Sequence, residues 1–154
     1  MFRRCSVALV SPLLIANLHP LAQAAEKTPA DLVLVHQGTL PIILTVPHGG
    51  REAIPGVPAR NLEGKSQGGR WGGFEGGGDF NTDILAHGIA AEIKALTGKE
   101  VYLVMAKFQR KFIDPNRPPE IALDSAEARP YYDHYHGSIR RLIDEIRKNI
   151  QLAC

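Results

Sequence analysis

Residues 41–50, PIILTVPHGG, decide how this chain is expected to fold. The aliphatic and β-branched run from 42 to 46 predicts a buried strand, and the Pro-His-Gly-Gly that follows predicts an abrupt end to it. Ligands of open α/β sheets bind outside the carboxyl ends of strands, and paired glycines leave room around a side chain there. His48 is therefore a candidate active-site residue and metal ligand. The alternative is a turn histidine with its ring in solvent.

The composition is that of an ordinary globular protein with one domain. The chain has 154 residues, of which 44% are hydrophobic and 22% are charged, and its formal net charge is +2. This charge, and the lack of a basic run interleaved with aromatic residues, argue against a nucleic-acid partner and against a membrane-surface protein. The partner that we expect, a small-molecule or peptide substrate with a carboxylate, follows from individual residues and motifs and not from the composition.

Residues 1–24 have the pattern of a secretory signal peptide. Arg3 and Arg4 form a positive start, an apolar stretch covers residues 5–18, and residues 22–24 read Ala-Gln-Ala, a typical cleavage signal. The apolar stretch is too short to span a bilayer. We expect export to the periplasm or the extracellular space, a mature domain over residues 25–154, and no stable membrane insertion after cleavage. The alternatives are a misplaced start and an uncleaved anchor.

After cleavage Cys154 would be the one remaining cysteine, so no internal disulfide is expected. It is also the last residue and directly follows an amphipathic pattern. A helix that runs to a terminus without a cap suggests a chain that continues elsewhere or was cut short.

The order of the expected elements indicates an α/β fold. Strands are expected at 32–36 and 40–46, joined by a three-residue turn that favours a hairpin. A helix follows to about Thr97, closed by Gly98, and a third strand at 101–108 should lie parallel to the second. A final amphipathic helix covers about 132–152. The first helix has an apolar stripe of Leu85, Ile89, Ile93 and Leu96.

Glycine dominates residues 64–78, where it supplies eight of the fifteen residues. Such a segment has a high ordering entropy and cannot form a core. We interpret it as an active-site loop, with Trp71 and Phe74 as its apolar groups, and the alternative is a flexible linker. The P-loop pattern is absent.

Acidic residues open the first helix near the expected position of His48. Asp83 lies in the first turn, where it is a candidate second metal ligand or a charge favoured by the helix dipole. Asp79 is the stronger candidate for a cap. His87 falls opposite the apolar stripe and is expected in solvent.

The third strand is followed by a proline-rich loop, Asp114-Pro115-Asn116-Arg117. Arg117, held by rigid backbone, is a candidate for binding a substrate carboxylate, with Asn116 beside it. The alternative is a structural pair between Arg117 and a nearby acid. Either His134 or His136 could be a surface residue or a wall of the site, and His136 is favoured as the inward one. Arg110 and Lys111 are expected to be solvated, as surface charges usually are.

Four segments together resemble the N-formylglutamate amidohydrolase (deformylase) family. They are VPHGG at 46–50, the glycine-rich run with Asn-Thr-Asp at 81–83, FQRKFIDPNRPP at 108–119 and YYDHYHGSIRRLIDEI at 131–146. Their order and spacing cover most of the mature chain. The resemblance implies a mixed, mainly parallel sheet flanked by helices, akin to zinc carboxypeptidases, and hydrolysis of an N-acyl (formyl) glutamate-like amide or another amide that bears a carboxylate.

The same resemblance implies roles for individual residues. His48 matches the first histidine ligand of Zn²⁺, Asp83 the acidic second ligand, and Arg117 the arginine that holds a substrate carboxylate. The third ligand would lie beyond Cys154, in a further strand, and residues after that strand would supply the general base. The signal peptide and the glycine-rich run indicate an exported, divergent branch. Two alternatives stay open: a truncated, non-catalytic binder of carboxylated peptides or cell-wall fragments, and an incomplete product without a stable fold.

Overall fold

The computed structural model describes residues 27–61 and 77–153. The predicted signal peptide, Trp71, Phe74 and Cys154 lie outside these ranges. In chain order the elements are β1 (Val33–His36), β2 (Ile43–Val46), α1 (Thr82–Thr97), β3 (Tyr102–Ala106), the one-turn α2 (Pro119–Ala122), a 3₁₀ turn (Ala126–Ala128) and α3 (Arg129–Ala153). The α/β class is as predicted.

The three strands form one mixed sheet in the order β1-β3-β2. The predicted parallel pairing of β2 with β3 is confirmed, with Thr45 opposite Val104. The predicted hairpin is wrong, because β3 lies between β1 and β2 and pairs antiparallel with β1. The turn after β1 bonds to Glu100, two residues before β3: the amides of Thr39 and Leu40 donate to its carbonyl at 2.7 and 2.8 Å.

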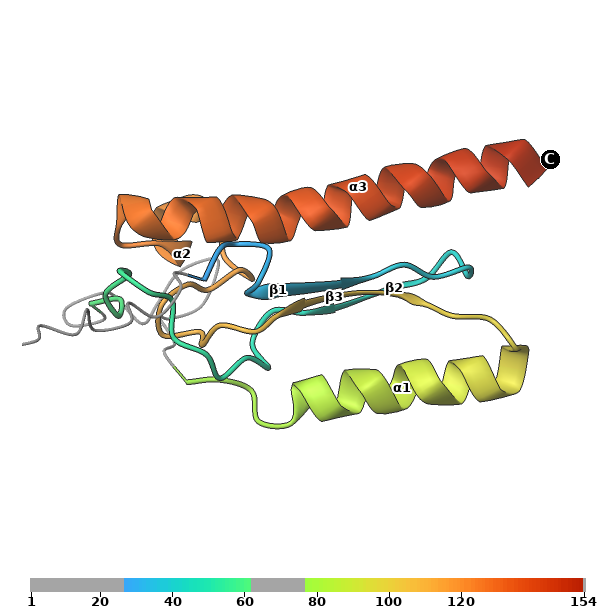
Figure 1. The fold of residues 1–154 in the computed structure, drawn as a ribbon, viewed down its shortest axis with the longest axis horizontal. Coiled ribbons are helices and arrows are strands. Elements are labelled where there is room, and N and C mark those ends of the chain that lie inside the picture. The colour runs from blue at the N-terminus through green and yellow to red at the C-terminus, as the bar shows by residue number, and fades with distance from the viewer. Residues whose placement is uncertain (1–26, 62–76, 154) are drawn as a thin grey trace, which may run out of the picture.

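Two long helices cover the sheet on opposite faces and make a three-layer arrangement (Figure 1). Helix α3 packs on one face, where Leu142 and Tyr135 join the main core with Val104 and Phe108. The expected amphipathic helix at 132–152 is thereby confirmed, and it begins three residues earlier, at Arg129. Burial of its apolar stripe against the sheet holds this helix in place.

Helix α1 covers the other face through small side chains. Its buried residue is Ala86, which packs with Val46, Leu103 and Met105. The helix ends where predicted, at Gly98, whose left-handed backbone lets its amide donate to the Lys94 carbonyl at 2.8 Å. The sheet does not cover most of the predicted apolar stripe: Ile93 is half-buried, and the other three members are exposed, namely Leu85, Ile89 and Leu96.

Candidate functional site

The site forms where β2 ends, α1 begins and the chain leaves β3. Two glycines allow these three segments to lie close to one another. A Cβ at Gly49 would lie 2.9 Å from the backbone nitrogen of Asp83, and one at Gly50 would lie 2.2 Å from the carbonyl carbon of Lys107. Any other residue at these positions would push the turn away from the two neighbouring segments. The glycines therefore fix the position of His48, the residue before them.

The imidazole of His48 lies between two carboxylates. The side chain is buried, with 4% exposed, and its Nε2 is 2.7 Å from Oδ1 of Asp114. Its Nδ1 is 3.0 Å from Oδ2 of Asp79. The three residues come from the end of β2, the segment before α1 and the loop after β3. The sequence prediction of a histidine at the carboxyl end of β2 is confirmed, and its ring is not in solvent.

Asp114 is the most deeply buried charge of the site, with 1% exposed. Besides His48, the amide of Asn116 donates to Oδ1 at 3.0 Å, and Nε of Arg110 donates to Oδ2 at 2.8 Å. Burial alone would raise the pKa of Asp114, but the hydrogen bonds from His48 and Arg110 outweigh it and lower the pKa to about 2. Asp114 is therefore a carboxylate throughout the physiological range.

The charge of Asp114 decides the tautomer of His48. A carboxylate only accepts hydrogen bonds, so Nε2 of His48 carries the hydrogen. In the neutral imidazole Nδ1 is then a lone pair, and it faces the carboxylate of Asp79. Two acceptors at this distance repel each other, so either a proton or a metal cation between them completes the arrangement.

Arg110 links the two acids. Its guanidinium is buried, with Nη2 2.8 Å from Oδ2 of Asp114 and Nη1 3.9 Å from Oδ1 of Asp79. The expectation that Arg110 is a solvated surface charge is wrong, because Asp114 provides a buried partner for it. Sequence spacing offered a signal: residues 110 and 114 are four apart, a separation that a tight turn can close.

Asp83, the predicted second ligand, lies in the first turn of α1 beside this group. Its Oδ1 is buried without a hydrogen bond and is 3.6 Å from Nη2 of Arg51. The carboxylates that the structure brings to His48 are those of Asp79 and Asp114. The assignment of Asp79 as a helix cap is wrong, since the cap position is Asn81 and Asp79 bonds the imidazole instead. A ligand role for Asp83 stays a prediction.

Two small cavities adjoin His48 and Asp79. One, of about 210 Å³, lies among the turn glycines, Arg51 and Gln109. The other, of about 220 Å³, lies between β2 and α1 and is lined mainly by apolar side chains, including Leu44 and Leu85. The side chain of Asp79 is 55% exposed at this place, so it reaches the solvent side of the buried pair.

The predicted substrate-binding residues lie around the loop that follows β3. Arg117 is half-buried, with Nε 4.0 Å from Oδ2 of Asp114. Asn116 is exposed. His136 is half-buried on α3, and its Nε2 donates to the Pro115 carbonyl at 3.0 Å. Burial lowers the pKa of His136, which favours the neutral ring. The structure thus places all three residues at one loop, and contact with a substrate stays a prediction.

His48 and Asp79 supply donors that suit Zn²⁺. The metal binds imidazole nitrogen at about 2.0–2.1 Å and carboxylate oxygen at about 2.0–2.2 Å, so two ligands of a tetrahedral ion lie roughly 3.3 Å apart. The 3.0 Å between Nδ1 and Oδ2 is close to this separation. Asp114 would then accept the hydrogen bond from the other ring nitrogen, Nε2, as carboxylates do in many zinc sites. Over residues 27–61 and 77–153, no group of three or more His, Cys, Asp or Glu residues is arranged to hold a metal.

Comparisons with known proteins give no relative for this chain. No model of a known protein family matches it, nor does any curated protein or solved structure. Among the described residues, no helix is long and apolar enough to cross a bilayer. The grounds for proposing a function are therefore the chemistry of the site and the motifs of the sequence.

Proposed function

We propose that this protein is an exported, zinc-dependent amidohydrolase that acts on an N-acyl (formyl) glutamate-like substrate or on another amide that bears a carboxylate. One observation carries the proposal: a buried imidazole is bonded on one side to a buried carboxylate and faces a half-exposed carboxylate on the other. The sequence resemblance to N-formylglutamate amidohydrolases supports it independently.

The buried half of this arrangement orients the ring. Asp114 accepts the Nε2 hydrogen of His48, and Arg110 holds Asp114 in turn. Such outer partners fix the tautomer and the direction of a metal-binding histidine. In its neutral form His48 would direct the lone pair of Nδ1 toward Asp79 and the cavities, which is the orientation that a hydrolytic metal site requires.

The exposed half is where the reaction would occur. Zn²⁺ held by His48 and Asp79 would lower the pKa of a bound water to about 7 and polarise the scissile carbonyl. A ligand role for Asp83, whose Oδ1 lacks a hydrogen bond and lies 3.6 Å from Nη2 of Arg51, is part of this proposal. Arg117 provides a cation that suits a substrate carboxylate, because a guanidinium binds two oxygens at once.

Hydrolysis of N-formyl-L-glutamate tests this proposal. The purified chain is supplied with Zn²⁺, and the release of free glutamate is measured for the wild type, His48→Ala and Arg117→Ala. We expect His48→Ala to lower kcat/KM at least about 100-fold, in the range known for lost catalytic groups. Arg117→Ala should act mainly by raising KM.

His87→Ala is the matched control, because His87 is an exposed histidine on α1. We expect it to keep wild-type activity. Hydrolysis that is absent in the wild type, or equal in His48→Ala and His87→Ala, would contradict the proposal.

One observation favours a second candidate, a non-catalytic binder of carboxylated peptides or cell-wall fragments. The described residues place two donors, rather than three, at the possible metal position. For such a binder, retention of a carboxylated peptide should survive a chelator and be lost in Arg117→Ala. For the hydrolase, the chelator should abolish turnover.

A further inference from the structure

The outer edge of β1 is unpaired among the described residues. The sheet order is β1-β3-β2, so β1 is bonded to β3 along one side. The Lys107 amide donates to the Leu32 carbonyl at 2.9 Å. Because backbone groups alternate in direction along an antiparallel strand, the N–H and C=O groups of Val33 and Val35 point away from β3. These groups are available to a further strand.

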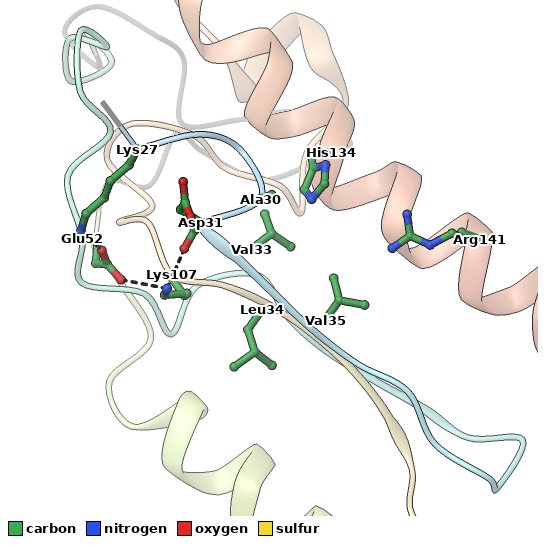
Figure 2. A pocket seen from close by; sticks show the side chains of 10 residues that line it. All are labelled: Lys27, Ala30, Asp31, Val33, Leu34, Val35, Glu52, Lys107, His134 and Arg141. Carbon is green, nitrogen blue, oxygen red and sulfur yellow. Dashed lines mark hydrogen bonds and ion pairs between the residues drawn. The ribbon is translucent and has the colours of Figure 1, made fainter. Parts of the chain in front are cut away.

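A cavity of about 910 Å³ extends along this edge, and its lining includes the side chains of β1 as well as His134 and Arg141 of α3. Figure 2 shows that His134 and Arg141 reach from α3 toward β1, where Val33 and Val35 face them. At the far end Lys107 lies 3.6 Å from Glu52, and its ammonium donates to the Asp31 carbonyl at 2.6 Å. Glu52 also pairs with Lys27.

The charge of this cavity is positive on balance. Three cationic side chains, Lys27, Lys107 and Arg141, line it with two acidic ones, Asp31 and Glu52. Within residues 27–61 and 77–153, both lysines have acidic partners and Arg141 forms no ion pair. Arg141 is exposed, so its guanidinium is available to an incoming carboxylate.

A second cavity, of about 350 Å³, flanks the same edge on the face covered by α1. Leu34 points to this face and packs against the cluster that contains Ala86. Ala90, Ala91 and Leu103 line the cavity as well. These apolar side chains form one part of its lining. The rest is polar and includes His36, His87 and the ion pair of Lys94 with Glu100.

We propose that the β1 edge binds an extended segment of a partner protein whose side chains alternate between acidic and small apolar. Side chains of an added strand point alternately to the two faces of the sheet. One set would enter the first cavity near Arg141 and His134, and the other would enter the apolar part of the second cavity, beside Leu34. Backbone bonds to Val33 and Val35 supply affinity, and the two cavities supply specificity. This inference does not depend on the hydrolase function.

Fluorescence anisotropy with synthetic peptides tests the inference on the full chain. The probe is a labelled peptide of alternating Glu and Val, six residues long, and its control has Lys in place of Glu. We expect the Glu peptide to bind at least tenfold more tightly than the Lys peptide. Because exposed charges are screened by salt, the difference should shrink at 0.5 M NaCl. Equal binding of the two peptides would overturn the inference.

Two variants distinguish the proposed edge from other surfaces. Arg141→Glu should weaken binding of the Glu peptide three- to tenfold, whereas Arg140→Glu, at the exposed neighbour on α3, should weaken it less than twofold. Val35→Pro removes an outward N–H and leaves the bonds from β1 to β3, so it should abolish binding while the circular dichroism spectrum is retained. Equal effects of the two arginine variants, or full binding by Val35→Pro, would contradict the site.

Discussion

Asp114 is the residue on which the geometry of the site depends. It accepts hydrogen bonds from His48, Arg110 and the Asn116 amide, and it is almost completely buried. A buried carboxylate is stable only when such donors compensate its lost hydration. One side chain therefore anchors the imidazole, the buried guanidinium and the proline-rich loop together.

Replacing Asp114 with Asn should destabilise the fold strongly. The change removes the buried charge partner of the Arg110 guanidinium and leaves it the more distant, half-exposed Asp79, and broken buried pairs cost roughly 3–5 kcal/mol. Asp133→Asn is the control, because Asp133 pairs with Arg129 on the surface and exposed pairs contribute about 0–1 kcal/mol. Urea denaturation measures both free energies of unfolding. Similar losses in the two variants would show that the buried network is not stabilising.

Asp114 should also make stability depend on acidity. Its pKa is lowered from 3.8 to about 2, so the unfolded chain binds a proton at a higher pH than the folded one. The stabilisation is therefore complete above about pH 3.8 and is lost as the pH falls toward 2. The free energy of unfolding, measured at several values between pH 5 and pH 2, should fall more steeply with decreasing pH for the wild type than for Asp114→Asn. Parallel curves would contradict the lowered pKa.

At this scale the sequence predicted the position of His48 but not its partners. The position follows from local signals, namely an aliphatic run and the glycines that end it. The contacts with Asp79 and Asp114 join residues 31 and 66 positions away along the chain. Such contacts depend on how the segments pack, and a single sequence carries little information on that.

Among the elements, the turn after β2 has the least tolerance for change. Gly50 lies so close to Lys107 and Phe108 that an added Cβ would meet their backbone atoms at 2.2–2.4 Å. Backbone cannot move aside as a flexible side chain does, so the turn or the end of β3 must shift. This contact positions His48 relative to the loop that carries Asp114.

Gly50→Ala should therefore lower stability by about 1–3 kcal/mol, as overpacking does. Gly88→Ala is the matched change in the middle of α1, where a Cβ would meet nothing within 4 Å. We expect Gly88→Ala to raise stability by about 0.5–1 kcal/mol, because glycine is a poor helix former. Thermal unfolding followed by circular dichroism compares them. A neutral Gly50→Ala would show that the close approach is not required.

The elements that the sequence predicted correctly are those with local signals. Periodicity and the Gly98 cap located α1, and the stripe of α3 located the last helix. The predicted pairing of β1 with β2 was wrong. The short turn between them suggests a hairpin, but it passes the start of β3, which lies between the two strands. Strand order depends on contacts between segments distant in the chain, which turn length alone does not determine.

In the molecule as a whole, chemistry-bearing side chains gather at one end of the sheet. The carboxyl ends of the parallel strands β2 and β3 and the amino end of α1 meet there (Figure 1). His48, Asp79 and Asp114 come from these three places. Periodicity in the sequence predicted an amphipathic α1 but not which side chains the sheet would cover, and Leu85 and Leu96 remain exposed.

The most direct test of the proposed metal centre is Zn²⁺ binding measured by isothermal titration calorimetry on the full chain. We expect one tight site in the wild type and in His87→Ala. His48→Ala and Asp79→Asn should each weaken binding at least tenfold, because each removes a donor of the facing pair. A wild type that binds Zn²⁺ no more tightly than His48→Ala would contradict the metal centre.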